Sequence, residues 1–214
     1  MRWALLENVP EEDVRRLLSV ARHRRFARNE VVFHEHDPAD TLHLIIKGRF
    51  VVRAQTPLGD RAILAVLGPG EMFGELSLLG EEDARRSASV VAVEAGETHS
   101  VHQLDFDGLR KRHPETAQVL IAILAGQVRR LSRHLLEALY VPADKRVLRR
   151  LVEVAALYPD GVVPLTQEDL ASLAGTSRAT VNRVLREAEA RGSLTLGRGR
   201  TCVLDADELA RRGR

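Results

Sequence analysis

The chain has 214 residues, 44% hydrophobic and 29% charged, which is enough to bury one large core or two smaller ones. Its only cysteine, Cys202, excludes an internal disulfide framework, a multi-cysteine zinc site and an all-cysteine iron–sulfur cluster within one chain. No apolar run approaches the roughly 18 residues that span a membrane, and the first residues lack the pattern of an export signal. We therefore expect a cytoplasmic protein without a membrane partner.

Charge is distributed unevenly along the chain. Residues 1–112 hold 16 Lys and Arg against 18 Asp and Glu, whereas residues 143–214 hold 13 against 10. Lys145 is the only lysine among those 13, and arginine suits contacts to phosphate and guanine. The basic excess therefore favours a nucleic-acid partner at the C-terminal end.

The N-terminal half predicts a helix followed by short strands. Asn8 or its neighbour is expected to cap the helix, whose first turn holds the acidic residues 11–13. From about Val31 to Val101 short β runs alternate with turn signals, which favours a sandwich or a jelly-roll barrel. The predicted strands are 31–33, 42–46, 50–52, 62–66 and 90–93, and the predicted turns are 37–38, 47–48, 57–60, 68–70 and 94–96.

A glycine-bounded loop that begins at Gly70 leads into a short predicted helix, and Arg86 lies just before the next strand. Exposed amides at a helix N-terminus attract an anion, and an arginine arriving from the next strand would complete a phosphate cradle. The alternative interpretation is a structural turn with a surface arginine.

A long helix is predicted between Pro114 and Pro142. Apolar residues recur there at steps of four and three, which is a heptad pattern lasting about three heptads. Two interpretations stay open: a helix that lies on its own domain, or a parallel dimer seam on one side with the sensor domain on the other. We favour the dimer, because flanking apolar residues widen the stripe. The expected seam consists of Ile121, Leu124, Val128, Leu131 and Leu135, and residues 141–144 are expected to form a hinge.

Residues 167–185 predict a helix-turn-helix. Thr166 is expected to cap the first helix, with Asp169 in the capping-box position, and Gly175 supplies the turn. Thr176 or Ser177 is expected to cap the second helix. The alternative interpretation is an ordinary helical hairpin with a solvated arginine face.

The second helix of this pair is expected to enter a major groove of DNA. A β-hairpin, or wing, is expected to follow it, with two arginines at its tip placed for phosphates. The expected DNA contacts are Thr166, Gln167, Ser177, Arg178, Ala179, Thr180, Asn182, Arg183, Arg198 and Arg200, and Arg186 also faces outward.

These motifs resemble the Crp/Fnr family of transcription regulators over essentially the whole chain. The matching segments are the turn glycines Gly48 and Gly70, the cassette 73–79 with residues 86–88, the helix end 128–131, and 165–171 with 175–183. The resemblance implies an α+β fold: a cyclic-nucleotide-binding-type β jelly roll at 1–112, a long dimerisation helix at 113–141, and a winged helix-turn-helix at 142–214.

The resemblance also implies site residues and partners. Gly74 and Glu75 would hold the ribose region of a cyclic nucleotide, and Arg86, Ser87 and Ala88 its phosphate. The implied partners are double-stranded DNA with a near-palindromic operator, a second copy of the chain, and RNA polymerase. No cofactor is obligatory.

The base end of the implied pocket departs from the cyclic-AMP-responsive members. Their threonine and serine that contact adenine correspond here to His134 and Leu135. Leucine cannot hydrogen-bond a base, which leaves His134 as the candidate base contact. Cyclic AMP, another cyclic nucleotide, a different anion, or no ligand at all remain alternatives. The last of these is a constitutively DNA-competent regulator.

The recognition helix also departs from the family. Its usual arginine–glutamate–arginine readers correspond to Arg178, Ala179 and Arg183. Each arginine can bind a guanine bidentately, whereas alanine cannot accept from cytosine. The hypothesis is an operator that keeps its guanines and is relaxed at the pair that the glutamate would read.

Two further function classes were weighed. A cupin-type metalloenzyme is suggested by His34, Glu35 and His36 with Asp40 and His43, but the later Pro-Gly turn supplies no further histidine. We therefore expect no metal site and no enzyme activity. His34, His36 and His43 are expected at the surface or in loops. No role is expected for His99, His102 or His113. A nucleotide-binding module acting on a partner protein is the other class, against which the helix-turn-helix argues.

Overall fold

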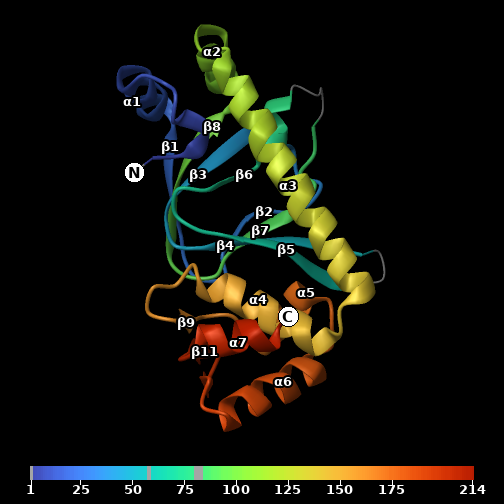
Figure 1. Ribbon diagram of the computed structural model, residues 1–214. Helices are drawn as coiled ribbons and strands as arrows, with labels where there is room; N and C mark the ends of the chain where they lie inside the picture. Colours follow the sequence, from blue (N-terminus) through green and yellow to red (C-terminus); the bar gives the residue numbers. More distant parts are fainter. Residues whose placement is uncertain (1, 57–58, 80–83) are drawn as a thin grey trace. The chain divides into compact units, whose positions relative to one another are not determined.

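The computed structural model describes residues 2–56, 59–79 and 84–214 (Figure 1). They form two compact units, one of Met1–Ala54 with Ala65–Arg129 and one of Gln55–Leu64 with Arg130–Arg214. The predicted turn at 57–60 includes residues 57 and 58, which lie outside the described residues. The expected limits of the three domains, after residues 112 and 141, stay a prediction.

Strands β1 to β8 form two four-stranded sheets, and all of their residues except Gln55 of β4 and 61–64 of β5 belong to the first unit. One has the order β1-β8-β3-β6 and the other β2-β7-β4-β5. All the predicted strands are present, and their ends agree within three residues. The bounds are β1 Arg22–Phe26, β2 Val31–Phe33, β3 Thr41–Lys47, β4 Phe50–Gln55, β5 Arg61–Leu67, β6 Met72–Phe73, β7 Ser89–Ala92 and β8 Gly96–His102.

Two apolar clusters hold this unit together. One cluster joins both sheets through buried aromatic side chains, among them Phe26, Phe50 and Phe73. The other packs the helices against the β1-β8-β3-β6 sheet, with Phe106 and Leu109 fully buried. Burying such side chains is the main favourable term in forming a sheet pair of this kind.

The first unit also holds helices and short 3-10 turns, of which α3 continues from Arg130 on into the second unit. They are η1 Ala4–Leu6, α1 Glu11–Val20, η2 Glu75–Leu79, α2 Gln103–Arg112 and α3 Glu115–Tyr140. The expected cap at Asn8 is wrong: Pro10 is the N-cap residue of α1 and supplies no side-chain cap. The acidic first turn is confirmed, with Glu11, Glu12 and Asp13 at the positive end of the helix dipole.

Strands β1, β6 and β8 were not predicted from the sequence, and β1 shows why such a strand is missed. Its residues Arg22-His23-Arg24-Arg25 are all exposed, and only Phe26 is buried. A strand at the edge of a sheet can carry charged side chains on both faces. Its sequence then lacks the alternation of apolar and polar residues that predicts a half-buried strand.

The buried position of His43 contradicts the expected surface location. It lies in β3 with 2% of its surface exposed, stacks on Phe73 at 4.9 Å, and lies 3.1 Å from Thr98 Oγ1. Burial lowers the pKa of His43 to about 3, so the ring is neutral. His34 and His36 are exposed, as predicted.

The other histidines without an expected role take structural ones. The Nδ1 atom of His102 accepts a hydrogen bond from the Leu104 amide and caps α2. The ring of His113 lies between Asp13, at 3.0 Å, and Glu115, at 3.3 Å, and joins α1 to the start of α3.

The second unit is a helical domain with a small sheet of order β10-β11-β9. Val147, Leu151, Leu170, Val181 and Leu185 form part of its core. The predicted helix pair and wing are confirmed. The bounds are α4 Ala143–Ala155, β9 Val162–Val163, α5 Gln167–Ala174, α6 Arg178–Ala190, β10 Leu194–Gly197, β11 Arg200–Val203 and α7 Ala206–Arg212.

Candidate functional site

Gly74 and Arg86 lie against each other in the first unit. Gly74 has φ +79°, and a Cβ there would come within 2.6 Å of Arg86 Nη1 and 2.9 Å of the Thr41 carbonyl oxygen. Only glycine adopts this backbone conformation and this close approach without strain. The loop therefore brings its backbone directly against a guanidinium.

Arg86 is held from several sides. Its Nη1 donates to the Thr41 carbonyl and its Nη2 to Thr41 Oγ1, each at 2.8 Å. The guanidinium carbon lies 4.0 Å from the centre of the Phe33 ring, a cation–π arrangement. The Arg86 amide donates to the Asp37 carbonyl, and the Arg86 carbonyl accepts from the His36 amide.

The charge of Arg86 has no ion-pair partner among the described residues. The residue is 5% exposed, and its buried Nε atom has no hydrogen-bond partner within that same part of the chain. Burial lowers the pKa of Arg86, although the charges of Asp40, Asp37 and Glu75 oppose that shift. A buried cation with a spare donor fits an anionic ligand.

The other cassette residues differ in exposure. Glu75 begins η2, is 9% exposed, and accepts a hydrogen bond of 3.0 Å from Gln127 on α3. Ser87 is exposed and Ala88 is 6% exposed. The structure thus brings Gly74 together with Arg86 and fixes Glu75 nearby, while the contacts expected of Ser87 and Ala88 stay a prediction.

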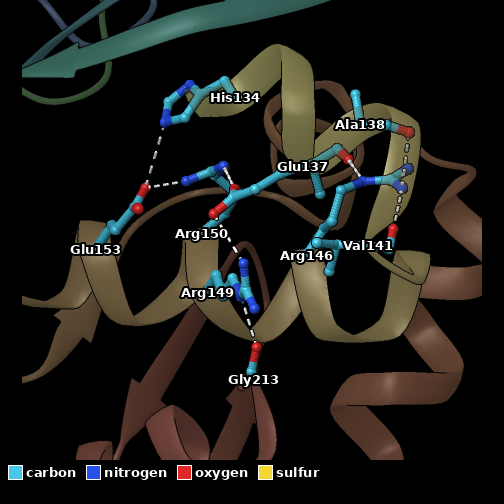
Figure 2. A network of polar contacts seen from close by, with 10 residues as sticks. His134, Glu137, Ala138, Val141, Arg146, Arg149, Arg150, Glu153 and Gly213 are labelled. Carbon is cyan, nitrogen blue, oxygen red and sulfur yellow. Dashed lines mark hydrogen bonds and ion pairs between the residues drawn. The ribbon is translucent and has the colours of Figure 1, made fainter. Parts of the chain in front are cut away.

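His134 belongs to the second unit, whereas the other five expected effector residues belong to the first. Its Nε2 lies 3.9 Å from Glu153 on α4 (Figure 2). Burial and the charge of Arg150 lower the pKa of His134. The structure gives this histidine a place between two helices of the second unit, and its expected contact with a base stays a prediction.

His134 borders a network of charged residues between α3 and α4 (Figure 2). Arg150, 3% exposed, pairs with both Glu137 and Glu153. Glu137, 9% exposed, also accepts a hydrogen bond from Arg149 at 2.9 Å. The Arg149 guanidinium in turn donates to the Gly213 carbonyl near the C-terminus. The sequence did not predict this network, because Glu137, which joins it, lies 12 and 13 residues from its two arginine partners.

Arg146 satisfies the end of two helices at once. It donates to the Val141 carbonyl at 2.7 Å, where α3 ends, and to the carbonyls of Ala174 and Gly175, where α5 ends. Carbonyls at a helix C-terminus lack intrahelical donors. The Arg146 guanidinium donates the missing hydrogen bonds at both helix ends. The expected hinge at 141–144 is thereby tied to the turn of the helix-turn-helix.

The predicted seam on α3 is largely exposed. The exposed fractions are 64% for Ile121, 62% for Val128, 47% for Leu131 and 61% for Leu135. Leu124 differs, because it packs partly against the core of the first unit. An apolar stripe of this length is unusual on a helix that faces water.

The helix-turn-helix has the predicted caps. Thr166 and Asp169 form a reciprocal capping box at the start of α5, and Gly175 ends the helix with φ 60°. Ser177, rather than Thr176, caps α6 by accepting from the Thr180 amide at 3.1 Å. Thr166 and Ser177 each satisfy a backbone N–H that the first turn of a helix leaves without an intrahelical partner.

The outward face of α6 carries the expected DNA contacts. Ser177, Arg178, Ala179, Asn182 and Arg183 are exposed, and Thr180 is half-buried. Asn182 donates to Gln167 on α5 at 3.1 Å, so these two expected contacts are already linked. Arg198 and Arg200 of the wing are exposed as well.

The described residues contain neither a cluster of metal ligands nor a helix suited to a membrane. Within 2–56, 59–79 and 84–214 no group of His, Cys, Asp and Glu side chains is arranged to hold a metal ion. Over the same residues, no helix combines the length and the apolarity that crossing a bilayer requires.

The fold and the two sites define a sensor unit joined to a DNA-binding unit of the winged helix-turn-helix class. Comparison with known families supports this division into two functional units. Residues 23–113 match the cyclic nucleotide-binding domain, and residues 145–212 match the Crp-like helix-turn-helix domain. The chain belongs to the Crp/Fnr family of transcription regulators and is not an enzyme.

Two curated relatives show the extent of the likeness. A cyclic AMP receptor protein of Thermus thermophilus is 36% identical over 205 residues, covering 94% of this chain and 93% of that one. A CRP-like cAMP-activated global transcriptional regulator of Mycobacterium tuberculosis is 33% identical over 199 residues, with 88% and 87% covered.

Solved structures agree on the fold. The catabolite activator protein of Thermus thermophilus has a TM-score of 0.57 at 33% identity, with 98% of both chains covered. The c-di-GMP responsive global regulator CLP of Xanthomonas campestris has a TM-score of 0.76 at 22% identity, with 91% of this chain and 99% of that one covered. This second likeness supports the fold alone.

Proposed function

We propose that this chain acts as a homodimeric, sequence-specific DNA-binding regulator whose sensor unit binds a cyclic nucleotide. The observation that carries the DNA-binding part is the capped α6, which exposes Arg178 and Arg183 on one face of a Crp-like helix-turn-helix. Two such helices related by a two-fold axis would enter successive major grooves about 34 Å apart. The operator would therefore be nearly palindromic.

The exposed stripe of α3 supports the dimer. Ile121, Val128, Leu131 and Leu135 present apolar side chains at heptad spacing, the pattern that a second identical helix covers. Sedimentation of the purified protein tests this directly. A monomer at micromolar concentration would contradict the proposal, and Val128→Glu with Leu135→Glu should convert a dimer to monomers.

The buried guanidinium of Arg86 supports the effector part. It offers an unused Nε donor next to the Gly74 backbone, which suits a phosphate. The relatives named as cAMP-activated make cyclic AMP the first ligand to test. When bound, its phosphate would be held by Arg86, and Glu75 would accept from its ribose hydroxyl.

The effector experiment is a calorimetric titration of cyclic AMP into the purified protein, with cyclic GMP for comparison. Saturable micromolar binding, about 8 kcal/mol, that Arg86→Gln abolishes supports the proposal. The absence of heat with either nucleotide favours the ligand-independent regulator. Circular dichroism of Arg86→Gln shows whether the variant stays folded.

The DNA experiment compares two arginines. Selection from random duplexes gives an operator, and binding to it is compared with binding to a random duplex. Arg178→Ala should weaken operator binding by about tenfold or more, because one bidentate guanine contact discriminates by about 1–3 kcal/mol. Arg200→Ala should weaken both duplexes alike. Equal effects of the two variants on both duplexes would contradict the assignment.

Recruitment of RNA polymerase is the remaining expected interaction.

A further inference from the structure

The two arginines expected to read guanine differ in their surroundings. Arg178 has no ion-pair partner among the residues that the structure describes. Arg183, one and a half turns along α6, is paired twice. Its Nη1 lies 2.8 Å from Glu187 Oε1, and its Nη2 lies 3.5 Å from Asp144 Oδ2.

The two carboxylates come from different elements. Glu187 lies one turn further along α6, and Asp144 lies in the first turn of α4. The hydrogen bond that Arg183 donates to Glu187 raises the pKa of Arg183. All three side chains are about half exposed, so the pairs stay accessible to water and to a ligand at this surface.

The ion pairs of Arg183 continue into a larger set of charged residues. Glu187 Oε2 lies 3.9 Å from Arg212 on α7, which itself lies 3.9 Å from Glu208. The connected arginines and acids, which are Arg183, Arg212, Asp144, Glu187 and Glu208, carry a net charge of −1. Within this connected set the acids outnumber the arginines, so the charge of Arg183 is neutralised by its own partners.

We infer that Asp144 and Glu187 are specificity-determining residues, which prevent Arg183 from binding DNA phosphates indiscriminately. This inference rests on the proposed DNA-binding function. Affinity for random DNA comes from counterion release when cations meet phosphates. A neutralised arginine contributes little to it. Each Nη still has a second N–H, so Arg183 can donate to the in-plane acceptors of guanine while its carboxylates stay in place.

The test measures binding of a selected operator and of a random duplex of equal length, by fluorescence anisotropy from 50 to 300 mM salt. Glu187→Gln should bind the random duplex about three- to tenfold more tightly near 0.1 M salt, with a salt slope steeper by about 0.9. Operator binding should change less, so the ratio of the two affinities falls. Asp144→Asn removes the other carboxylate independently and should act in the same direction.

Two further variants define the cause. Asp207→Asn removes one exposed acidic charge from α7 without touching Arg183, and it should leave the affinity ratio unchanged within about twofold. In an Arg183→Ala background, Glu187→Gln should no longer steepen the salt slope, because the cation that it would release is absent.

Three outcomes would overturn the inference. If both acid variants weaken operator binding and leave random binding unchanged, the carboxylates orient Arg183 instead. If the gain persists in full without Arg183, it is simple charge repulsion. If the wild-type protein itself does not prefer any selected operator, the proposed function fails and the inference fails with it. Thermal melts of each variant report whether it is folded.

Discussion

The Oε1 atom of Glu189, near the end of α6, accepts a hydrogen bond of 2.9 Å from the backbone amide of Leu196 in β10. Its Oε2 accepts another, of 2.8 Å, from Arg186. One carboxylate thus joins the recognition helix to the wing. The Leu196 amide lowers the pKa of Glu189, so the link persists through the neutral range and is lost only as acid protonates the carboxylate.

Glu189→Ala should therefore weaken binding to any duplex by about two- to fivefold, because the wing arginines lose their fixed position. Anisotropy titrations measure this. The loss should disappear in a variant that already lacks Arg198 and Arg200. An equal loss in that background would show that Glu189 acts elsewhere.

Gly74→Ala should destabilise the protein by about 1–3 kcal/mol, because φ is positive there and Cβ would meet Arg86 and Thr41. Urea unfolding measures the change. Gly108→Ala is the matched control in α2, where nothing lies within 4 Å of the added Cβ. That variant should gain about 0.5–1 kcal/mol from helix propensity. Similar effects at both positions would contradict the crowded geometry at Gly74.

Glu137→Gln should destabilise the second unit by about 3–5 kcal/mol, because the buried Arg150 would lose a carboxylate partner. Thermal unfolding measures this loss of stability, and amide exchange in α6 and the wing shows that it falls on the second unit. The double variant Glu137→Leu, Arg150→Met removes both charges and should recover most of the loss. A double variant as unstable as the single one would show that the pair acts through packing rather than charge.

Acid should weaken the first unit through His43. Its pKa of about 3 lies well below that of an unfolded histidine. The contribution of neutral His43 is complete above about pH 6.5 and is lost as pH falls toward 3, at up to about 1.4 kcal/mol per pH unit. His43→Gln should flatten the dependence of unfolding free energy on pH between 6 and 4. An unchanged slope would assign the acid sensitivity to other groups.

Local patterns predicted much of the fold. The capping box of Thr166 and Asp169, the turn at Gly175 and the cap at Ser177 were all expected, because each depends on residues a few positions apart. Strands with apolar runs were found for the same reason. The edge strand β1 was missed, since a run of exposed arginines has no period.

The candidate sites were predicted less completely. Gly74 and Arg86 were expected to share an effector site; the structure places them against each other, and their contact with an effector stays a prediction. Their partner Thr41, which occupies two donors of the guanidinium, was not expected. It lies 45 residues away along the chain, beyond the range of any local pattern.

The sequence by itself determined the family, the helix-turn-helix and the apolar stripe of α3, because these follow from motif order, capping residues and heptad spacing. Only the tertiary structure decided which charges meet. It buried His43, joined Glu137 to Arg150, and placed Asp144 beside Arg183 of α6. The physical reason is that burial and ion pairing depend on elements packed together from distant parts of the chain, and no spacing in the sequence encodes such a contact.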